Sequence, residues 1–397
     1  TTPSLTGTDN HPSVVTFFEQ RLVFAATNNN PQTLFFSKNA DYTNFTTGTG
    51  DNDALIYTIA SNKVNAIRYL SATRILNIGT SGGEYVLTTT NGSPVTPTST
   101  VIRKYSNYGC VNAEVVQVAD VTLFAQRGAR KVREFRYVGE VDVGGYTAPD
   151  ITVLAEHLTE GGIEEFAFQQ EPESIVWARR ADGTLLGLTY RREEEIVAWH
   201  KHVLGGAFSG GQARVESIIS LPTDSGEDEL YMIVKRTING QTKQYVEVMK
   251  QFDFGNDTTG AFFVDSGLSY SGSSVSSLSG LYHLEGQTVS VLANGATHSD
   301  QTASDGGISL NFAITTGAVG LAYTSEMQTL RIESGSSDGT SQGKPKRIHD
   351  VTLRLHETVG AEVGTDANNA DRIFFRDSSM PMNAAVPLFT GDKDIEF

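Results

Sequence analysis

The segment Gln20–Lys38, QRLVFAATNNNPQTLFFSK, decides the fold of this chain. Two apolar runs flank an Asn-rich turn, which is the pattern of a β-hairpin because positive φ costs little there. Four further segments repeat the pattern: Thr73–Thr89 (TRILNIGTSGGEYVLTT), Asp120–Tyr137 (DVTLFAQRGARKVREFRY), Glu173–Tyr190 (ESIVWARRADGTLLGLTY) and Asp228–Met249 (DELYMIVKRTINGQTKQYVEVM). Their starts lie roughly 50 residues apart, and a single hairpin cannot bury its own faces. We therefore predict an all-β fold with a β-propeller built from hairpin repeats of ~50 residues.

The composition of the chain predicts further segments before and after the propeller. Residues 1–12 are polar and indicate a linker or the end of a missing N-terminal element, and the propeller pattern occupies 13–256. Residues 257–333 predict a small β-barrel or sandwich module, and 334–345 a flexible loop. Residues 346–397 predict C-terminal strands that pack on the core or on a neighbouring subunit. Because the chain starts and stops abruptly, we expect a fragment of a longer polypeptide.

Several individual elements are expected outside the five hairpins. The spacing of apolar residues in Asp150–Leu158 predicts one short helix, which Gly161 and Gly162 would stop. Short alternating runs predict strands, whereas Ser266–Ser279 stands out only as rich in Ser and Gly. The predicted strands are Gln287–Ala293, Gly307–Ala313, Ala318–Tyr323, Lys346–Glu357, Asp371–Phe375, Ala385–Phe389 and Lys393–Phe397.

Charge and cysteine usage restrict the function classes. The formal net charge is −16, and a protein with this charge is not built to grip nucleic acid through clustered cations. The single cysteine, Cys110, excludes an intrachain disulfide framework, and we expect it to be a buried thiol of a protein folded in a reducing compartment. No window of about 18 apolar residues occurs, so we predict no membrane span.

We predict no catalytic residue, no cofactor site and no metal site. The acidic runs Glu164–Glu165, Glu193–Glu195 and Asp224–Glu229 could supply the carboxylate pair of a glycosidase, but runs of this kind are usually solvated turns. His200 and His202 would share one face of a strand, but no third ligand follows at a suitable spacing. Exposed strand histidines are the expected interpretation.

Two basic clusters are the candidate docking residues for a partner. The first contains Arg127, Arg130, Lys131 and Arg133, with Arg136 nearby; the second contains Lys344, Lys346 and Arg347. They either balance neighbouring acids or dock an acidic partner face or a neighbouring subunit.

Several strings of the chain resemble tail proteins of short-tailed phages. The most extended is His11–Phe45 (HPSVVTFFEQRLVFAATNNNPQTLFFSKNADYTNF). The others follow in the same order: Ile78–Tyr85, Phe124–Val132, Ala148–His157, Gln169–Tyr190, Ala198–His200, Arg236–Gln241 and His283–Gly295. The resemblance covers most of the chain and is to the tail nozzle family, also called tail tubular protein B or tail-stabilising protein.

The resemblance implies a propeller-bearing structural subunit without catalytic residues. Such subunits form a ring, expected to be a homo-hexamer, below the portal and adaptor, and genomic DNA leaves through its channel. The implied partners are the tail adaptor (tail tubular protein A), tail fibre or needle proteins, and DNA in non-specific passage. The implied location is the virion tail, with assembly in the host cytoplasm. The alternative that remains is a carbohydrate-binding or carbohydrate-cleaving β-propeller, similar to a tailspike or lectin.

Overall fold

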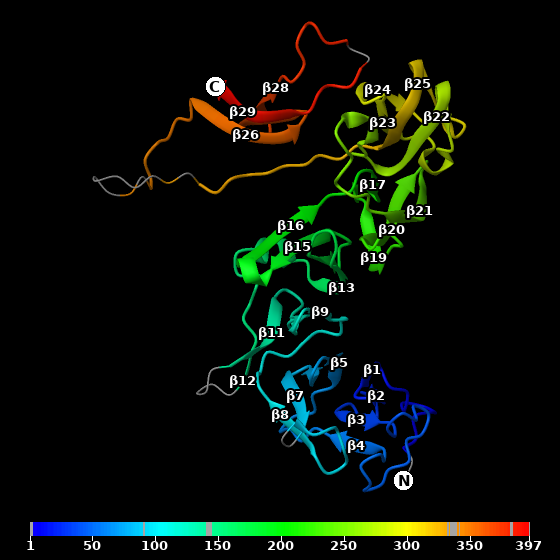
Figure 1. The fold of residues 1–397 in the computed structure, drawn as a ribbon, viewed down its shortest axis with the longest axis vertical. Helices are drawn as coiled ribbons and strands as arrows, with labels where there is room; N and C mark the ends of the chain where they lie inside the picture. Colours follow the sequence, from blue (N-terminus) through cyan, green and yellow to red (C-terminus); the bar gives the residue numbers. More distant parts are fainter. Residues whose placement is uncertain are drawn as a thin grey trace. The chain divides into compact units, whose positions relative to one another are not determined.

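The computed structural model describes residues 3–89, 92–139, 145–331, 333, 340, 342–381 and 384–396. The chain divides into two compact units, which are described separately below. The first contains residues 1–202 and 214–234, and the second contains 203–213 and 235–397. The predicted all-β class is confirmed, because strands dominate both units (Figure 1). The predicted boundary at residue 256 stays a prediction; the division of the units falls inside one strand, between Val234 and Lys235.

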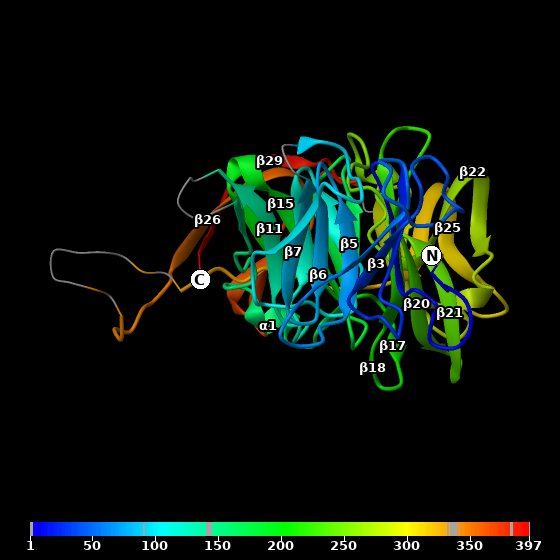
Figure 2. The same ribbon diagram turned by 90° about the horizontal axis from the view of Figure 1, so that it is seen from below.

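The first unit holds four antiparallel sheets, each made of four strands that are consecutive in the sequence. The first two sheets are β1 (Val14–Phe18), β2 (Arg21–Ala25), β3 (Thr33–Phe36), β4 (Leu55–Thr58), and β5 (Ile67–Ala72), β6 (Leu76–Thr80), β7 (Gly83–Thr89), β8 (Thr100–Lys104). The next two are β9 (Val116–Val118), β10 (Val121–Ala125), β11 (Val132–Val138), β12 (Gly145–Thr147), and β13 (Ile163–Gln169), β14 (Ile175–Arg180), β15 (Leu185–Arg191), β16 (Ile196–His202). Strands β5, β6 and β7 of the second sheet stand upright beside one another in Figure 2.

All five hairpins that the sequence indicates are present as paired neighbouring strands. In each four-stranded sheet the hairpin supplies the second and third strands: β2–β3, β6–β7, β10–β11 and β14–β15. The fifth hairpin joins β20 (Asp228–Ile238) to β21 (Gln241–Val248), beside β19 (Arg214–Pro222). Its turn is Asn239–Gly240, with φ of 48° and 70°. Two consecutive positive φ angles define a type I′ hairpin turn, which Asn-Gly adopts at the lowest cost.

The sheets of the first unit share their cores with one another. Leu76 and Ile78 of β6 join one apolar cluster with Val23 and Phe36 of the first sheet. Asn77, between them in β6, points to the other face and donates from Nδ2 to Thr122 Oγ1 in the third sheet at 3.1 Å. Because side chains alternate along a strand, the same strand serves two cores.

The predicted helix is mostly wrong. Only Glu156–Thr159 is helical (α1), because Asp150 Oδ1 accepts hydrogen bonds from Thr152 N and Oγ1 and holds that segment in a turn. Leu154, one of the apolar residues whose spacing predicted the helix, is 95% exposed. Gly162, with φ of 81°, follows the helix as expected. Cys110 is buried, as predicted.

The second unit is organised around a sheet in the order β22-β25-β23-β24. Its strands are β22 (Asp265–Ser279), β23 (Thr288–Ala293), β24 (Ala296–Thr302) and β25 (Gly307–Leu321), and the short pair β17 (Ala207–Phe208) and β18 (Gly211–Gln212) also belongs to this unit. The two strands predicted at Gly307–Ala313 and Ala318–Tyr323 are one strand, so this prediction was wrong in detail. Ser266–Ser279, for which the Ser/Gly composition gave no strand signal, belongs to β22.

The C-terminal region contains two ribbons of two strands each. β26 (Asp350–Thr358) pairs with β29 (Phe389–Glu396), and β27 (Ala361–Asp366) pairs with β28 (Asn369–Ile373). The prediction of a separate strand at Ala385–Phe389 was wrong, because β29 begins only at Phe389. Phe397 and most of the predicted loop at 334–345 lie outside the described residues.

A buried arginine fastens a long loop to the first sheet. The guanidinium of Arg21 donates from Nη1 to the carbonyl oxygens of Ser37 (2.8 Å) and Asp53 (2.7 Å), and from Nη2 to that of Asp51 (2.7 Å). Arg21 is fully buried. Three backbone acceptors therefore share one buried side chain, and the carbonyl of Ser37 is itself in a buried residue.

We predict that Arg21→Met lowers the free energy of unfolding by about 3 kcal/mol, because it leaves the buried carbonyl of Ser37 and two loop carbonyls without their donor. Urea denaturation of the full chain measures the change. The matched control is Arg103→Met on β8, an exposed arginine, which should change stability by less than about 0.5 kcal/mol. Equal effects of the two substitutions would contradict the role assigned to Arg21.

Candidate functional site

Two of the predicted docking residues form ion pairs within the first unit. Arg130 Nη2 lies 3.2 Å from Glu160 Oε1, and Lys131 Nζ lies 3.0 Å from Asp150 Oδ2 and 2.9 Å from Glu156 Oε1. The hydrogen bonds to Glu156 and Asp150 raise the pKa of Lys131. This geometry favours the charge-balancing interpretation for Arg130 and Lys131, and their docking role stays a prediction.

Arg133 is fully engaged inside the unit. Its Nε donates to Gln126 Oε1 at 2.7 Å and its Nη1 donates to the Ala148 carbonyl at 2.6 Å. The guanidinium also lies 3.4 Å from the centre of the Tyr108 ring. Because Arg133 is only 9% exposed, it contributes to packing more than to the outer surface.

Arg136 pairs with a buried carboxylate that the sequence did not reveal. Its Nε lies 2.6 Å from Glu134 Oε1, and Arg192 Nη1 donates to Glu134 Oε2 at 3.2 Å. The Glu134 side chain is fully buried, so both cations compensate the cost of placing its charge in the interior. Burial, and after it the Glu134 charge, raises the pKa of Tyr190.

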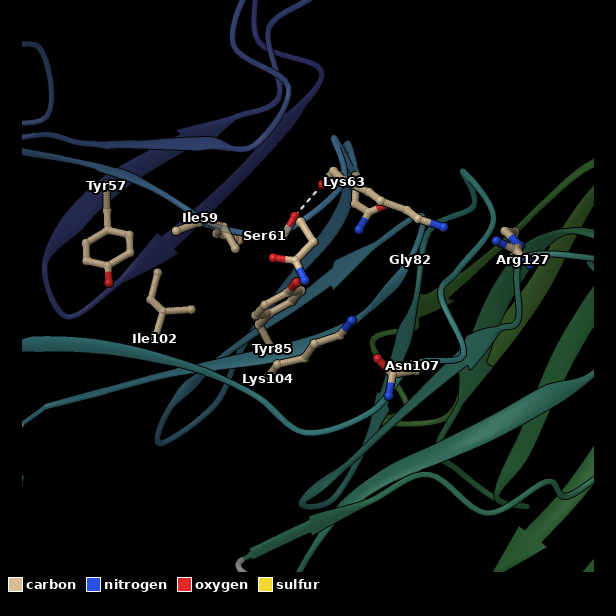
Figure 3. A pocket seen from close by; sticks show the side chains of 13 residues that line it. Tyr57, Ile59, Ser61, Lys63, Gly82, Tyr85, Ile102, Lys104, Asn107 and Arg127 are labelled. Atoms are coloured by element: carbon tan, nitrogen blue, oxygen red, sulfur yellow. Dashed lines mark hydrogen bonds between the residues drawn. The ribbon is translucent and has the colours of Figure 1, made fainter.

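Arg127 differs from the other members of the first cluster because it lines a pocket. The pocket has a volume of about 650 Å³ and lies between the first two sheets, with Arg127 coming from the β10–β11 turn. Its lining residues are Tyr57, Ile59, Ala60, Ser61, Asn62, Lys63, Asn65, Gly82, Tyr85, Ile102, Lys104, Asn107 and Arg127. Figure 3 shows that Lys63, Lys104 and Arg127 reach it from three different segments.

The second predicted cluster lies in the other compact unit. Lys344, Lys346 and Arg347 are all exposed, and Lys346 Nζ lies 3.3 Å from Glu333 Oε1. The two clusters therefore belong to separate bodies, and a docking role for Lys344, Lys346 and Arg347 stays a prediction.

The histidine pair is half-buried, so the expectation of exposed histidines was wrong. His200 Nδ1 and His202 Nε2 of β16 are 2.8 Å apart, and both rings pack edge-on against Trp177. A Cβ at Gly187 would come within 2.1 Å of the His200 ring, so this glycine makes room for it. Burial lowers the pKa of His200, and burial together with the charge of His200 lowers the pKa of His202 to about 4.

The acidic runs are used in structural contacts. Glu164 and Glu165 both pair with Arg179, at 2.9 Å each, and Glu165 Oε1 accepts a hydrogen bond from Ser217. Asp228 Oδ2 accepts a hydrogen bond from the backbone of Gln170. Within the ranges that the structure describes, no three His, Cys, Asp or Glu side chains gather in a way that could hold a metal ion.

The C-terminal ribbon of β26 and β29 has an apolar face without a core behind it. Val351, Leu353 and Leu355 alternate with polar residues along β26, and Val351 faces Ile395 across the ribbon. All of these side chains stay partly exposed, and within the described residues 350–396 only Ile373 is buried. A ribbon of two strands is marginally stable by itself. This face therefore requires cover.

An extended segment leads to this ribbon. Residues 322–330 follow β25 without regular structure, and all of them are exposed (Figure 1). Met327 is 89% and Leu330 92% exposed. Apolar side chains in an extended, uncovered segment are typical of an arm that contacts another chain.

We predict that acidification destabilises the chain through the histidine pair. The pKa of His202 is lower in the folded state than in the unfolded state. Its contribution to the free energy of unfolding is therefore fully present above about pH 6.5 and is lost as the pH falls towards 4. His202→Gln should therefore flatten the fall in melting temperature between pH 7 and 4. His157→Gln, an exposed histidine on α1, is the control and should leave the slope unchanged. Parallel curves for wild type and His202→Gln would contradict this prediction.

Comparison with known proteins gives no family for this chain. No family model matches, and no curated protein matches. Among solved structures, the chain is similar to Hsv2 of Kluyveromyces lactis ("complete loop 6CD") at 9% identity and a TM-score of 0.37, over 59% of this chain and 58% of that one. It is also similar to Hsv2 of Kluyveromyces marxianus at 8% identity and a TM-score of 0.34, over 59% and 60%. The chain thus spans less than two thirds of either protein.

Proposed function

We propose that this chain is a structural subunit of a short-tailed phage tail nozzle, a ring through which genomic DNA passes during ejection. The resemblance of several strings in order along the sequence suggests the family. The observation that carries the proposal is the amphipathic ribbon of β26 and β29. Among the described residues 350–396, only Ile373 is buried. A monomer gains little from such a ribbon, whereas a subunit that is covered by its neighbour gains a core.

A propeller scaffold is part of this proposal. In the first unit the first strand of one sheet contacts the first strand of another: β1 contacts β5, β9 contacts β13, and β13 contacts β19. Sheets that pack face to face and come together at their first strands resemble the blades of a propeller around an axis. The hairpin repeat of ~50 residues would then be the central pair of each blade, and the sheet of β22–β25 the small barrel or sandwich module.

We assign the cover of the ribbon to a neighbouring copy of this chain. The polar face of the ribbon is already satisfied within the chain, since Arg354 pairs with Asp392 at 2.9 Å and Thr352 donates to Asp394 at 2.6 Å. The apolar face is what remains to be buried. The extended arm 322–330 lies in the sequence between the sheet of β22–β25 and the ribbon. The ribbon could therefore pack on another subunit while the sheet and the ribbon both keep their strand pairing.

The proposed conduit is passive. A chain with a formal net charge of −16 repels DNA rather than gripping it, and cations condensed around DNA soften the repulsion. A lumen of this kind would let DNA move with little adhesion. The proposed partners are the tail adaptor (tail tubular protein A) and fibre or needle proteins in the virion tail, after assembly in the host cytoplasm.

The alternative is a carbohydrate-binding propeller. The pocket between the first two sheets favours it, because Tyr57 and Tyr85 line the pocket together with Asn side chains. No Asp or Glu is among the described residues that line the pocket, and these residues therefore offer no carboxylate pair of the kind that glycoside cleavage requires. This observation favours binding over cleavage.

The mass and symmetry of the purified chain test the proposed function. Mass photometry followed by electron-microscopy class averages should reveal a ring with a central hole, most simply of six copies, on its own or after addition of the adaptor. A chain that stays monomeric with the adaptor present would overturn the nozzle proposal.

We predict that Leu355→Asp on the apolar face of β26 prevents ring formation, because it places a charge in the face that a neighbour should bury. His356→Asp, one residue further along and on the polar face, is the matched control and should leave assembly intact. Mass photometry measures both variants. Equal assembly of the two would show that the apolar face of the ribbon is not an interface between copies.

A further inference from the structure

The pocket between the first two sheets combines positive charge with a size that suits a small molecule. At about 650 Å³ it falls in the range of ligand pockets, which runs from roughly 300 to 1,000 Å³. Among the described residues, three cations line it, namely Lys63, Lys104 and Arg127, and no acid does. The formal net charge of the chain is −16, yet every charged side chain that the structure describes in this lining is positive.

The cations of the pocket form no ion pair within the described residues, although Lys104 Nζ lies 5.7 Å from the centre of the Tyr85 ring. Among the described residues, Lys63, Lys104 and Arg127 take part in no ion pair, whereas Arg130 and Lys131, beside Arg127 in the sequence, pair with Glu160 and Asp150. Arg130 and Lys131 balance the charge of neighbouring acids. The positive charges of the pocket are not balanced by an acid in this way.

The strand register explains why the pocket excludes the nearest buried acid. Tyr85 of β7 lies opposite Lys104 of β8, so both face the pocket. Glu84, the preceding residue, points to the opposite face, where it is buried beside Ser106. Burial raises the pKa of Glu84 to about 7.

Neutral hydrogen-bonding groups complete the lining. Asn62, Asn65 and Asn107 offer amide groups, which can both donate and accept. The ring of Tyr57 is half-buried at the β4 end of the pocket, beside Ile102 and away from Lys63 and Arg127 (Figure 3). This mixture matches a polyhydroxylated ring better than a bare inorganic anion.

The loop that carries Lys63 is fixed before any ligand binds. Gln32 Nε2 donates to Ser61 Oγ at 2.8 Å and to the Lys63 carbonyl at 3.3 Å. Asn65 packs directly on Gly82, where a Cβ would come within 2.5 Å of its side chain. A site whose loop is already ordered loses less entropy on binding.

We infer that this pocket binds a monosaccharide-sized ligand that carries a carboxylate or phosphate group. Lys63, Lys104 and Arg127 hold the anionic group, and the Asn side chains bind hydroxyls. The carboxylate and phosphate forms share the anionic oxygens that the cations recognise. The inference does not depend on the nozzle proposal, because all of the lining residues belong to the first unit.

Isothermal titration calorimetry of the full chain with four probes tests the inference. Galacturonate and glucose 6-phosphate carry the two candidate anionic groups, while galactose and inorganic phosphate each present half of the proposed ligand. We expect at least one of the two charged sugars to bind at least about 10-fold more tightly than galactose and inorganic phosphate, and the charged sugar that binds identifies the anionic group. Inorganic phosphate binding as tightly as both sugars, or no binding of either charged sugar, would overturn the inference.

Two variants locate the binding. Lys104→Met and Arg127→Met should each weaken binding of the charged sugar by about 10-fold or more, because each removes a charge-assisted hydrogen bond. Arg103→Met, next to Lys104 but outside the lining, is the matched control. An unchanged melting temperature shows that the variants are folded. Equal binding by Lys104→Met, Arg127→Met and Arg103→Met would place the ligand elsewhere and overturn the assignment.

Discussion

The first unit depends on sheets that are buried on both faces. β10 is the clearest case, because all five of its residues are buried. Val121 and Leu123 pack in one cluster with Val176 and Leu188 of the fourth sheet, while Phe124 packs on the other side against Tyr69 of the second sheet, with ring centres 5.8 Å apart. A sheet with no solvent face cannot be stable alone. The sheets therefore stabilise one another, and removing any one would expose the faces of its neighbours.

Buried charges fasten loops to this apolar framework. In the first unit Arg21 gathers three backbone carbonyls, and Glu134 is compensated by two arginines. The second unit repeats the device with Arg236, which is fully buried, pairs with Glu247 and donates from Nε to the Gly205 carbonyl at 2.8 Å. Burial of a charge is costly unless its partners are all present. Such groups favour the one loop conformation in which all of their partners are in place. Apolar contacts are less directional and discriminate less between loop conformations.

The hairpins could be predicted from the sequence because their signals are local. Asn239–Gly240 between two alternating runs specifies both the turn and the register over about 20 residues. β22 could not be predicted, because its Ser and Gly residues have no strand preference of their own and are held by pairing with β25, far along the chain. The helix predicted at Asp150–Leu158 does not form over its first residues, because an Asx turn at Asp150 holds them in another conformation. The pocket could not be predicted either, because it depends on contacts between residues far apart in the sequence. The sequence presents Arg127 and Arg130 as equivalent members of one basic cluster, and only the structure shows that Arg130 forms an ion pair whereas Arg127 lines the pocket.

The charge of the whole chain limits how the basic pocket can work. An anionic ligand that approaches a surface with a formal net charge of −16 is repelled at long range, and salt screens this repulsion beyond a Debye length of about 8 Å at physiological ionic strength. Within the pocket the cations act at contact distance, where screening is weak. The pocket would therefore gain little from long-range attraction and would select ligands by contacts that form only after entry. Specificity would then rest on the fixed loop and its hydrogen-bonding groups, with the cations acting as a short-range filter for the sign of the charge.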